Sequence, residues 1–109
     1  MRRFEVGMTA DAVRDLEEII DWIARHDGSS RAQHVLERIE ATVDALERFP
    51  ERASHPPELL ALGIREYRET FFKPYRIVYH VDGARVIISL IVDGRRDMRT
   101  LLARRLLAG

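Results

Sequence analysis

Cysteine is absent from the sequence of 109 residues, which excludes disulfide bonds and thiol chemistry. Small secreted domains often depend on disulfides, so this absence favours a reducing compartment. Long apolar runs are absent too: the most apolar stretch, residues 86–92, includes Ser89 and is far too short to span a bilayer. Residues 1–10 include two arginines but lack the apolar segment of a signal peptide. We therefore expect a cytoplasmic protein without a membrane segment.

Motifs for metal binding, phosphate binding and nucleophilic catalysis are also missing. The four histidines fall in separate predicted elements and lack the i,i+4 spacing of a helical metal site. Gly63, Gly83 and Gly94 stand singly at predicted turns, not together in a phosphate-binding loop. No Ser-His-Asp spacing stands out. The sequence therefore predicts neither a metal nor a cofactor.

Charge is abundant, at 33% of residues, beside 46% hydrophobic residues, which is typical of a folded soluble domain. The formal net charge is zero, yet residues 11–51 are mainly acidic and residues 64–109 mainly basic. Lys73 is the only lysine, so arginine supplies nearly all the positive charge. Guanidinium groups bind carboxylates and phosphates through paired hydrogen bonds. The basic half therefore favours an acidic protein partner or nucleic acid, or else it simply solvates its own face.

Hydrophobic periodicity predicts a single α+β domain over residues 1–109. The predicted elements are a strand at 3–8, helices at 10–26 and 30–49, strands at 64–71, 75–81 and 85–92, and a short helix at 97–107. Thr9 is the expected N-cap of the first helix, and Ser29 or Ser30 that of the second. Because helices and strands are segregated, we expect an antiparallel helix hairpin packed on one face of an antiparallel sheet, in the order β-α-α-β-β-β. The other face is expected to be less well covered.

Arginines gather around the ends of the predicted strands, where neighbouring strand ends of a meander meet. If the face of Tyr75 meets the helices, Arg76 points to the opposite, open side of the sheet. Trp22 falls beside the apolar stripe of the first helix, either as part of an interaction surface or at the edge of the core. The arginines of this group are Arg65, Arg68, Arg76, Arg95, Arg96 and Arg99.

The back half contains the string Tyr75-Arg76-Ile77-Val78-Tyr79, then the Asp82-Gly83 hairpin, an apolar strand and the exit Gly94-Arg95-Arg96. In the front half, residues 10–19 open the first helix and Arg48-Phe49-Pro50 ends the second. In this order and spacing, the motifs resemble the RelE/ParE superfamily of type II toxin–antitoxin toxins, and the ParE-like members in particular.

The resemblance implies a toxin that arrests growth, functions in plasmid stabilisation and forms a tight complex with a cognate antitoxin protein. ParE-like members inhibit DNA gyrase, whereas RelE-like members cut mRNA on the ribosome. RNA-cleaving members have arginines that match Arg76 and Arg96. Their lysine positions, however, fall at Tyr67 and Glu69, and their tyrosine position falls at Leu102.

The chemistry of RNA cleavage favours the gyrase inhibitor. Cleavage by the 2′-OH needs a proton acceptor, and arginine is a poor base. His80 is about 13 Å from Arg76 along a strand, too far to serve the same phosphate. We therefore expect a non-catalytic inhibitor whose target-binding residues are Arg68, Arg76, Arg95, Arg96 and Arg99, and whose antitoxin-binding residue is Trp22.

Two alternatives stay open. One is a RelE-like mRNA endonuclease, in which Arg76 and Arg96 would be catalytic. The other is a non-toxic binding module of the same fold. Direct binding of nucleic acid is also left open.

Overall fold

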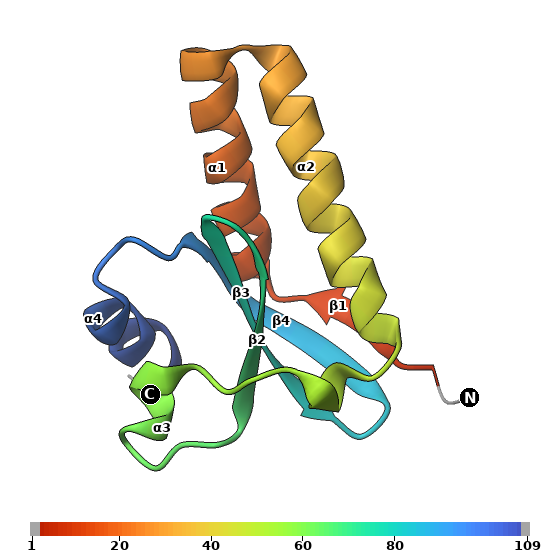
Figure 1. Ribbon diagram of the computed structural model, residues 1–109, viewed down its shortest axis with the longest axis vertical. Helices are drawn as coiled ribbons and strands as arrows, with labels where there is room; N and C mark the ends of the chain where they lie inside the picture. The colour runs from red at the N-terminus through yellow and green to blue at the C-terminus, as the bar shows by residue number, and fades with distance from the viewer. Residues whose placement is uncertain (1–2, 108–109) are drawn as a thin grey trace.

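A four-stranded sheet and a long helix hairpin organise the structure, a computed structural model that describes residues 3–107 (Figure 1). The α+β fold predicted from the sequence is confirmed. The elements are β1 (Glu5–Met8), α1 (Ala10–Asp27), α2 (Ser29–Asp44), η1 (Ala45–Glu47), η2 (Pro50–Arg52), α3 (Pro57–Leu60), β2 (Tyr67–Phe72), β3 (Tyr75–Asp82), β4 (Arg85–Asp93), α4 (Met98–Leu102) and the π-helical turn η3 (Ala103–Leu107).

The strand order in the sheet is β1-β4-β3-β2. Strands β2, β3 and β4 form the antiparallel meander that the sequence predicts. Strand β1 pairs with β4 in parallel, with Glu5 beside Arg85 and Met8 beside Ile88, so the sheet is mixed rather than purely antiparallel. The parallel pair is possible because the helix hairpin lies between the two strands in the chain, and parallel strands need such a long connection.

In the helix hairpin, the N-cap of α1 is the predicted residue, whereas the N-cap of α2 is not. The Thr9 side chain accepts a hydrogen bond from the backbone N–H of Ala12, which confirms it as the N-cap of α1. The predicted cap at Ser29 or Ser30 is wrong, because both serines already lie within α2. Gly28 alone separates the helices at φ 95°, in a backbone region that glycine reaches without steric cost.

The sheet is covered on both faces. Helices α1 and α2 pack on one face around a core that includes Ile23, Ile39, Ile77 and Tyr79. The other face is less well covered, as expected, because the short helices α3 and α4 pack on it over a second, smaller apolar cluster. This cluster consists of Leu59, Val78, Leu90, Val92, Met98, Leu101 and Leu102. Figure 1 shows α3 and α4 together beside the sheet, away from the hairpin.

No helix within residues 3–107 is both long enough and apolar enough to cross a membrane.

Candidate functional site

A pocket of about 460 Å³ lies between α1 and the carboxyl end of β4. Helix α1 contributes the exposed ring of Trp22, and the turn after β4 contributes Arg95 and Arg96. The structure therefore brings together residues that the sequence prediction assigned to two different partners. The complete lining is Asp15, Glu18, Ile19, Trp22, Tyr75, Ile91, Val92, Asp93, Arg95 and Arg96.

Trp22 is the most prominent apolar group at this pocket. It is 53% exposed, so it does not pack into the core edge. Its ring stacks on His26 with 4.1 Å between ring centroids, and His26 Nδ1 lies 2.8 Å from the backbone oxygen of Trp22. A large aromatic group held in place on a helix surface is typical of a binding surface.

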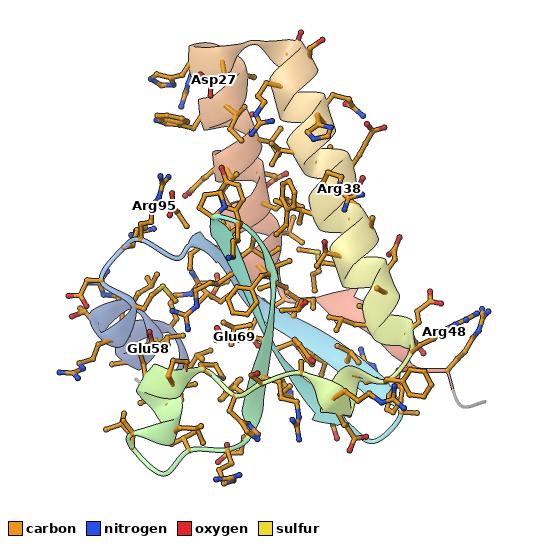
Figure 2. All side chains as sticks on the ribbon, in the orientation of Figure 1. Asp27, Arg38, Arg48, Glu58, Glu69 and Arg95 are labelled. Atoms are coloured by element: carbon orange, nitrogen blue, oxygen red, sulfur yellow. The ribbon has the colours of Figure 1, made fainter. Side chains whose placement is uncertain are left out.

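The arginines of the turn after β4 are exposed and held in position. Asp93 accepts hydrogen bonds of 2.9 Å from both the backbone N–H and Nε of Arg95, and this contact lowers the pKa of the Asp93 carboxyl. The Arg95 side chain nevertheless remains 78% exposed. The following helix is capped by Asp97, which accepts from Thr100 N–H, and it carries exposed Arg99. The turn therefore presents exposed guanidinium groups to solvent, and Figure 2 labels Arg95 among them.

Arg76 has the opposite environment, because only 11% of its side chain is exposed. Its Nη1 and Nη2 donate to the two carboxylate oxygens of Glu58 at 2.9 and 2.7 Å. Its Nε donates to Glu69 Oε1 at 2.8 Å. Figure 2 shows Glu58 on α3 and Glu69 on β2, on the side of the sheet that α3 and α4 cover. The expectation that Arg76 points to an open side is therefore wrong, since α3 lays Glu58 over it.

Arg76, Glu58 and Glu69 form one partly buried cluster of titratable groups. Hydrogen bonding to Arg76 lowers the pKa of Glu58. Burial raises the pKa of Glu69, which is 4% exposed, and outweighs the opposing hydrogen bond from Arg76. The hydrogen bonds to Glu58 raise the pKa of Arg76 above its ordinary value. The guanidinium fork of Arg76 is thus occupied by carboxylates and is permanently charged.

Gly94 completes this cluster from the turn after β4. A β-carbon at Gly94 would lie 2.7 Å from Cδ of Arg76 and 3.2 Å from the backbone oxygen of Pro74. Only glycine therefore allows the backbone to pass so close to the stem of Arg76. The sequence prediction treated Gly94 as a turn residue and missed this contact, which depends on a neighbouring strand.

Residues 6–98 match the family model described as the ParE toxin of the type II toxin–antitoxin system parDE. The chain belongs to the ParE toxin family. The RelE/ParE resemblance drawn from the motifs is confirmed, and so is its ParE-like character.

Relatives agree with this assignment. Toxin ParE3 of Caulobacter vibrioides is 29% identical over 91 residues, which cover 84% of this chain and 87% of that protein. A solved structure, described as a chromosomal ParDE TA system from P. aeruginosa, matches with a TM-score of 0.71 at 19% identity. That match covers 85% of this chain and 98% of the solved chain, and it shows a shared fold.

The positions at which RNA-cleaving superfamily members have lysine and tyrosine have contacts within this ParE family chain. Tyr67 meets His80 edge-on, with 5.7 Å between ring centroids. Glu69 is the buried partner of Arg76. Leu102 is 1% exposed, in the second apolar cluster. Glu69 and Leu102 are therefore buried, whereas Tyr67 is partly exposed.

Arg68 also serves the structure. Its Nη1 donates to the backbone oxygen of Ala53 at 2.6 Å, which ties the loop after η2 to β2. The strand register sets Arg68 beside Tyr79, whereas the turn of Arg95 begins next to Tyr75, at the other end of β3. The predicted target-binding set therefore divides into an exposed group at one turn and two partly buried arginines elsewhere.

The sequence prediction missed an ion pair between α1 and the C-terminal segment. Arg105 donates to both carboxylate oxygens of Asp15 at 2.9 and 3.0 Å, and to the backbone oxygen of Ser89 at 3.1 Å. Asp15 also accepts from the backbone N–H of Ile91. Nothing in the sequence signals a pair 90 positions apart. Because Asp15 lines the Trp22 pocket, the C-terminal segment is fastened directly beside it.

Histidine and acidic side chains do not assemble into a group of three or more that could hold a metal ion anywhere in residues 3–107.

Proposed function

We propose that this ParE family member inhibits DNA gyrase by binding it in the cytoplasm, and that a cognate antitoxin neutralises it in a tight complex. The supporting observation is that some arginines are exposed on the surface while others are held by contacts within the fold. Arg95 and Arg96 are exposed in one turn and line the pocket with Trp22, and Arg99 is exposed on the following helix α4. Arg76 is instead fixed between two carboxylates. This arrangement suits a binding surface better than a catalytic site.

An RNA endonuclease is less well supported by the geometry of Arg76. A phosphate would have to displace Glu58 or Glu69 from the guanidinium, and the remaining carboxylate would repel it. Arginine with a raised pKa does not act as a base at neutral pH. Of the two arginines that match the RNA-cleaving pattern, only Arg96 is exposed.

The contact surface for gyrase is accordingly smaller than the sequence predicts. We assign it to Arg95, Arg96 and Arg99, with the pocket floor between them and Trp22. Arg68 and Arg76 hold the sheet and its loops in position rather than touching the target. Guanidinium groups on a rigid turn favour an acidic protein surface as the target, since they bind carboxylates in pairs.

Neutralisation follows from the position of Trp22 beside these arginines. An apolar antitoxin side chain seated between Trp22 and Tyr75 would be the central anchor of the complex. Carboxylates on either side of that anchor would pair with Arg95 and Arg96. An antitoxin bound in this way covers the arginines that gyrase needs, so that the two partners cannot bind together.

Controlled expression in a bacterium that lacks the antitoxin tests the proposal. We expect growth arrest with filamentation and a DNA-damage response. A double variant, Arg95→Ala with Arg96→Ala, should relieve the arrest, while Arg14→Ala, which removes an exposed arginine paired with Asp11, serves as the matched control. Rapid loss of translation would support the endonuclease instead, and normal growth at good expression would support the non-toxic binding module.

A further inference from the structure

The bend between η1 and η2 holds an aromatic residue in an unfavourable backbone conformation. Phe49 has φ 54° and ψ 45°, in the left-handed region that bulky side chains rarely adopt. Within residues 3–107 it is the only residue other than glycine with a positive φ. Pro50 follows it, and a residue before proline favours an extended backbone, so Phe49 departs from that preference as well. Such outliers gather at functional sites, where the surrounding structure enforces them.

Contacts on both sides of Phe49 enforce this conformation. The side-chain hydroxyl of Tyr79 donates to the backbone oxygen of Pro50, and both of these side chains are fully buried. On the other side, the backbone oxygen of Glu47 accepts from the N–H of Phe4 at 2.9 Å. The bend is therefore fixed to β3 and to the segment before β1, and Phe49 lies between the two attachments.

Packing within the fold does not explain why a phenylalanine occupies this position. The Phe49 side chain is 49% exposed and belongs to neither apolar cluster. Its main contact is with the guanidinium of Arg52, whose Cζ lies 3.9 Å from the ring centroid. Asparagine or glycine would suit the left-handed backbone better. An exposed ring with an arginine over one face is typical of an interaction surface.

The charges around Phe49 indicate what kind of partner fits. Arg48 and Arg52 are exposed, and neither forms an ion pair with another of residues 3–107. Glu47 and Glu51 lie in the same stretch of chain, so positive charge does not accumulate there. A nucleic acid needs such an excess of positive charge. A protein surface does not, because its carboxylates can pair with individual guanidinium groups.

We propose that Arg48, Phe49 and Arg52, which we name the Phe49 corner, form an interaction surface for a protein partner. The partner seats an apolar side chain against the exposed part of the ring, and its carboxylates accept hydrogen bonds from the two arginines. The identity of that partner as DNA gyrase rests on the proposed function. In that case gyrase is contacted at two separate places, since Figure 2 shows Arg48 and Arg95 on opposite sides of the molecule.

Binding of purified gyrase to the immobilised full chain tests this proposal. Phe49→Asn removes the ring, and its urea unfolding midpoint should stay close to that of the wild type, because relief of the backbone offsets the lost contacts. We nevertheless expect Phe49→Asn to bind gyrase at least about ten-fold more weakly. Leu62→Asn is the matched control, since Leu62 is an apolar residue that is 60% exposed outside the Phe49 corner. It should bind gyrase like the wild type.

Charge reversal tests the expected carboxylates of the partner. Arg48→Glu should weaken gyrase binding about ten-fold or more, whereas Arg65→Glu, which reverses an exposed arginine outside the Phe49 corner, should leave it unchanged. If the wild type binds gyrase and Phe49→Asn binds equally well, or both reversed variants lose binding equally, this proposal alone is overturned. A DNA duplex that binds the wild type but not Phe49→Asn would also overturn it, by assigning the corner to nucleic acid. A wild type that does not bind gyrase contradicts the proposed function and this partner together.

Discussion

The arginines of this protein have different roles, and the degree of burial of each side chain determines which role it has. Arg95 forms an ion pair with Asp93 in solvent, where such pairs contribute little to stability. Arg76 is enclosed with Glu58 and Glu69, where removal of one partner leaves a charge without compensation. The sequence places both arginines near strand ends and gives no means to tell them apart.

Replacement of Arg76 by methionine tests the structural role of that residue. We expect Arg76→Met to lower the free energy of unfolding by about 3–5 kcal/mol, because Glu69 stays buried without its cation. Arg95→Met, in the exposed pair, should leave the unfolding midpoint unchanged. Urea unfolding followed by circular dichroism measures both variants, and similar midpoints for the two would contradict the difference in burial.

The cluster of Arg76, Glu58 and Glu69 predicts that the stability of the fold depends on pH. Hydrogen bonding to Arg76 lowers the pKa of Glu58 below 4.5, so the ionised form stabilises the fold above pH 4.5, and this contribution is lost as the pH falls through the lowered pKa. We expect Glu58→Gln to be less stable than the wild type near neutral pH, with the difference shrinking below pH 4.5. Urea unfolding of both proteins near neutral pH and below pH 4.5 measures this difference in stability.

Glu69 serves as the internal comparison, because burial raises its pKa above 4.5. Its ionisation therefore costs stability as the pH rises through the raised pKa. Wild type should lose stability relative to Glu69→Gln over that range, which is the opposite trend to Glu58→Gln. The same trend in both variants would show that burial does not outweigh the hydrogen bond from Arg76 in setting the pKa of Glu69.

At the scale of elements, local signals in the sequence predict what each segment forms but not where it packs. The α1 cap at Thr9 and the three strands of the meander depend on nearby residues, and they were predicted correctly. The parallel pairing of β1 and the packing of α4 depend on contacts between distant segments. The arginines of the turn after β4 are neighbours in the sequence and could be predicted as a group. The partners of Arg76 come from distant segments and could not be predicted.

The C-terminal segment η3 is fastened to α1 chiefly by the pair of Arg105 and Asp15. Asp15→Asn removes the charge that holds Arg105, and we expect η3 to detach more often while the core stays folded. Limited trypsin digestion should then cut faster after Arg104 and Arg105. Asp11→Asn, which alters an exposed pair on the same helix, is the control and should digest like the wild type.

At the scale of the whole molecule, α1 lies between two surfaces of different chemistry. One side presents Trp22 beside exposed arginines, and the other presents an apolar groove rimmed by acids. The zero net charge of the chain conceals this division.

The anchor role of Trp22 leads to a prediction for that complex. Trp22→Ala should weaken binding of a cognate antitoxin by about 2 kcal/mol, roughly 30-fold, because exposed aromatic anchors dominate such interfaces. Stability of the free toxin should change little, since the ring is half exposed. Isothermal titration calorimetry measures the affinity. An unchanged affinity would place the antitoxin elsewhere on the chain.

We propose that this chain inhibits DNA gyrase through the exposed arginines Arg95 and Arg96 in the turn after β4. The most direct test adds purified protein to gyrase and relaxed plasmid and follows supercoiling. We predict inhibition by the wild type and by Arg14→Ala, and little inhibition by Arg95→Ala with Arg96→Ala. Supercoiling at the normal rate in the presence of excess folded wild-type protein would contradict gyrase inhibition by this chain.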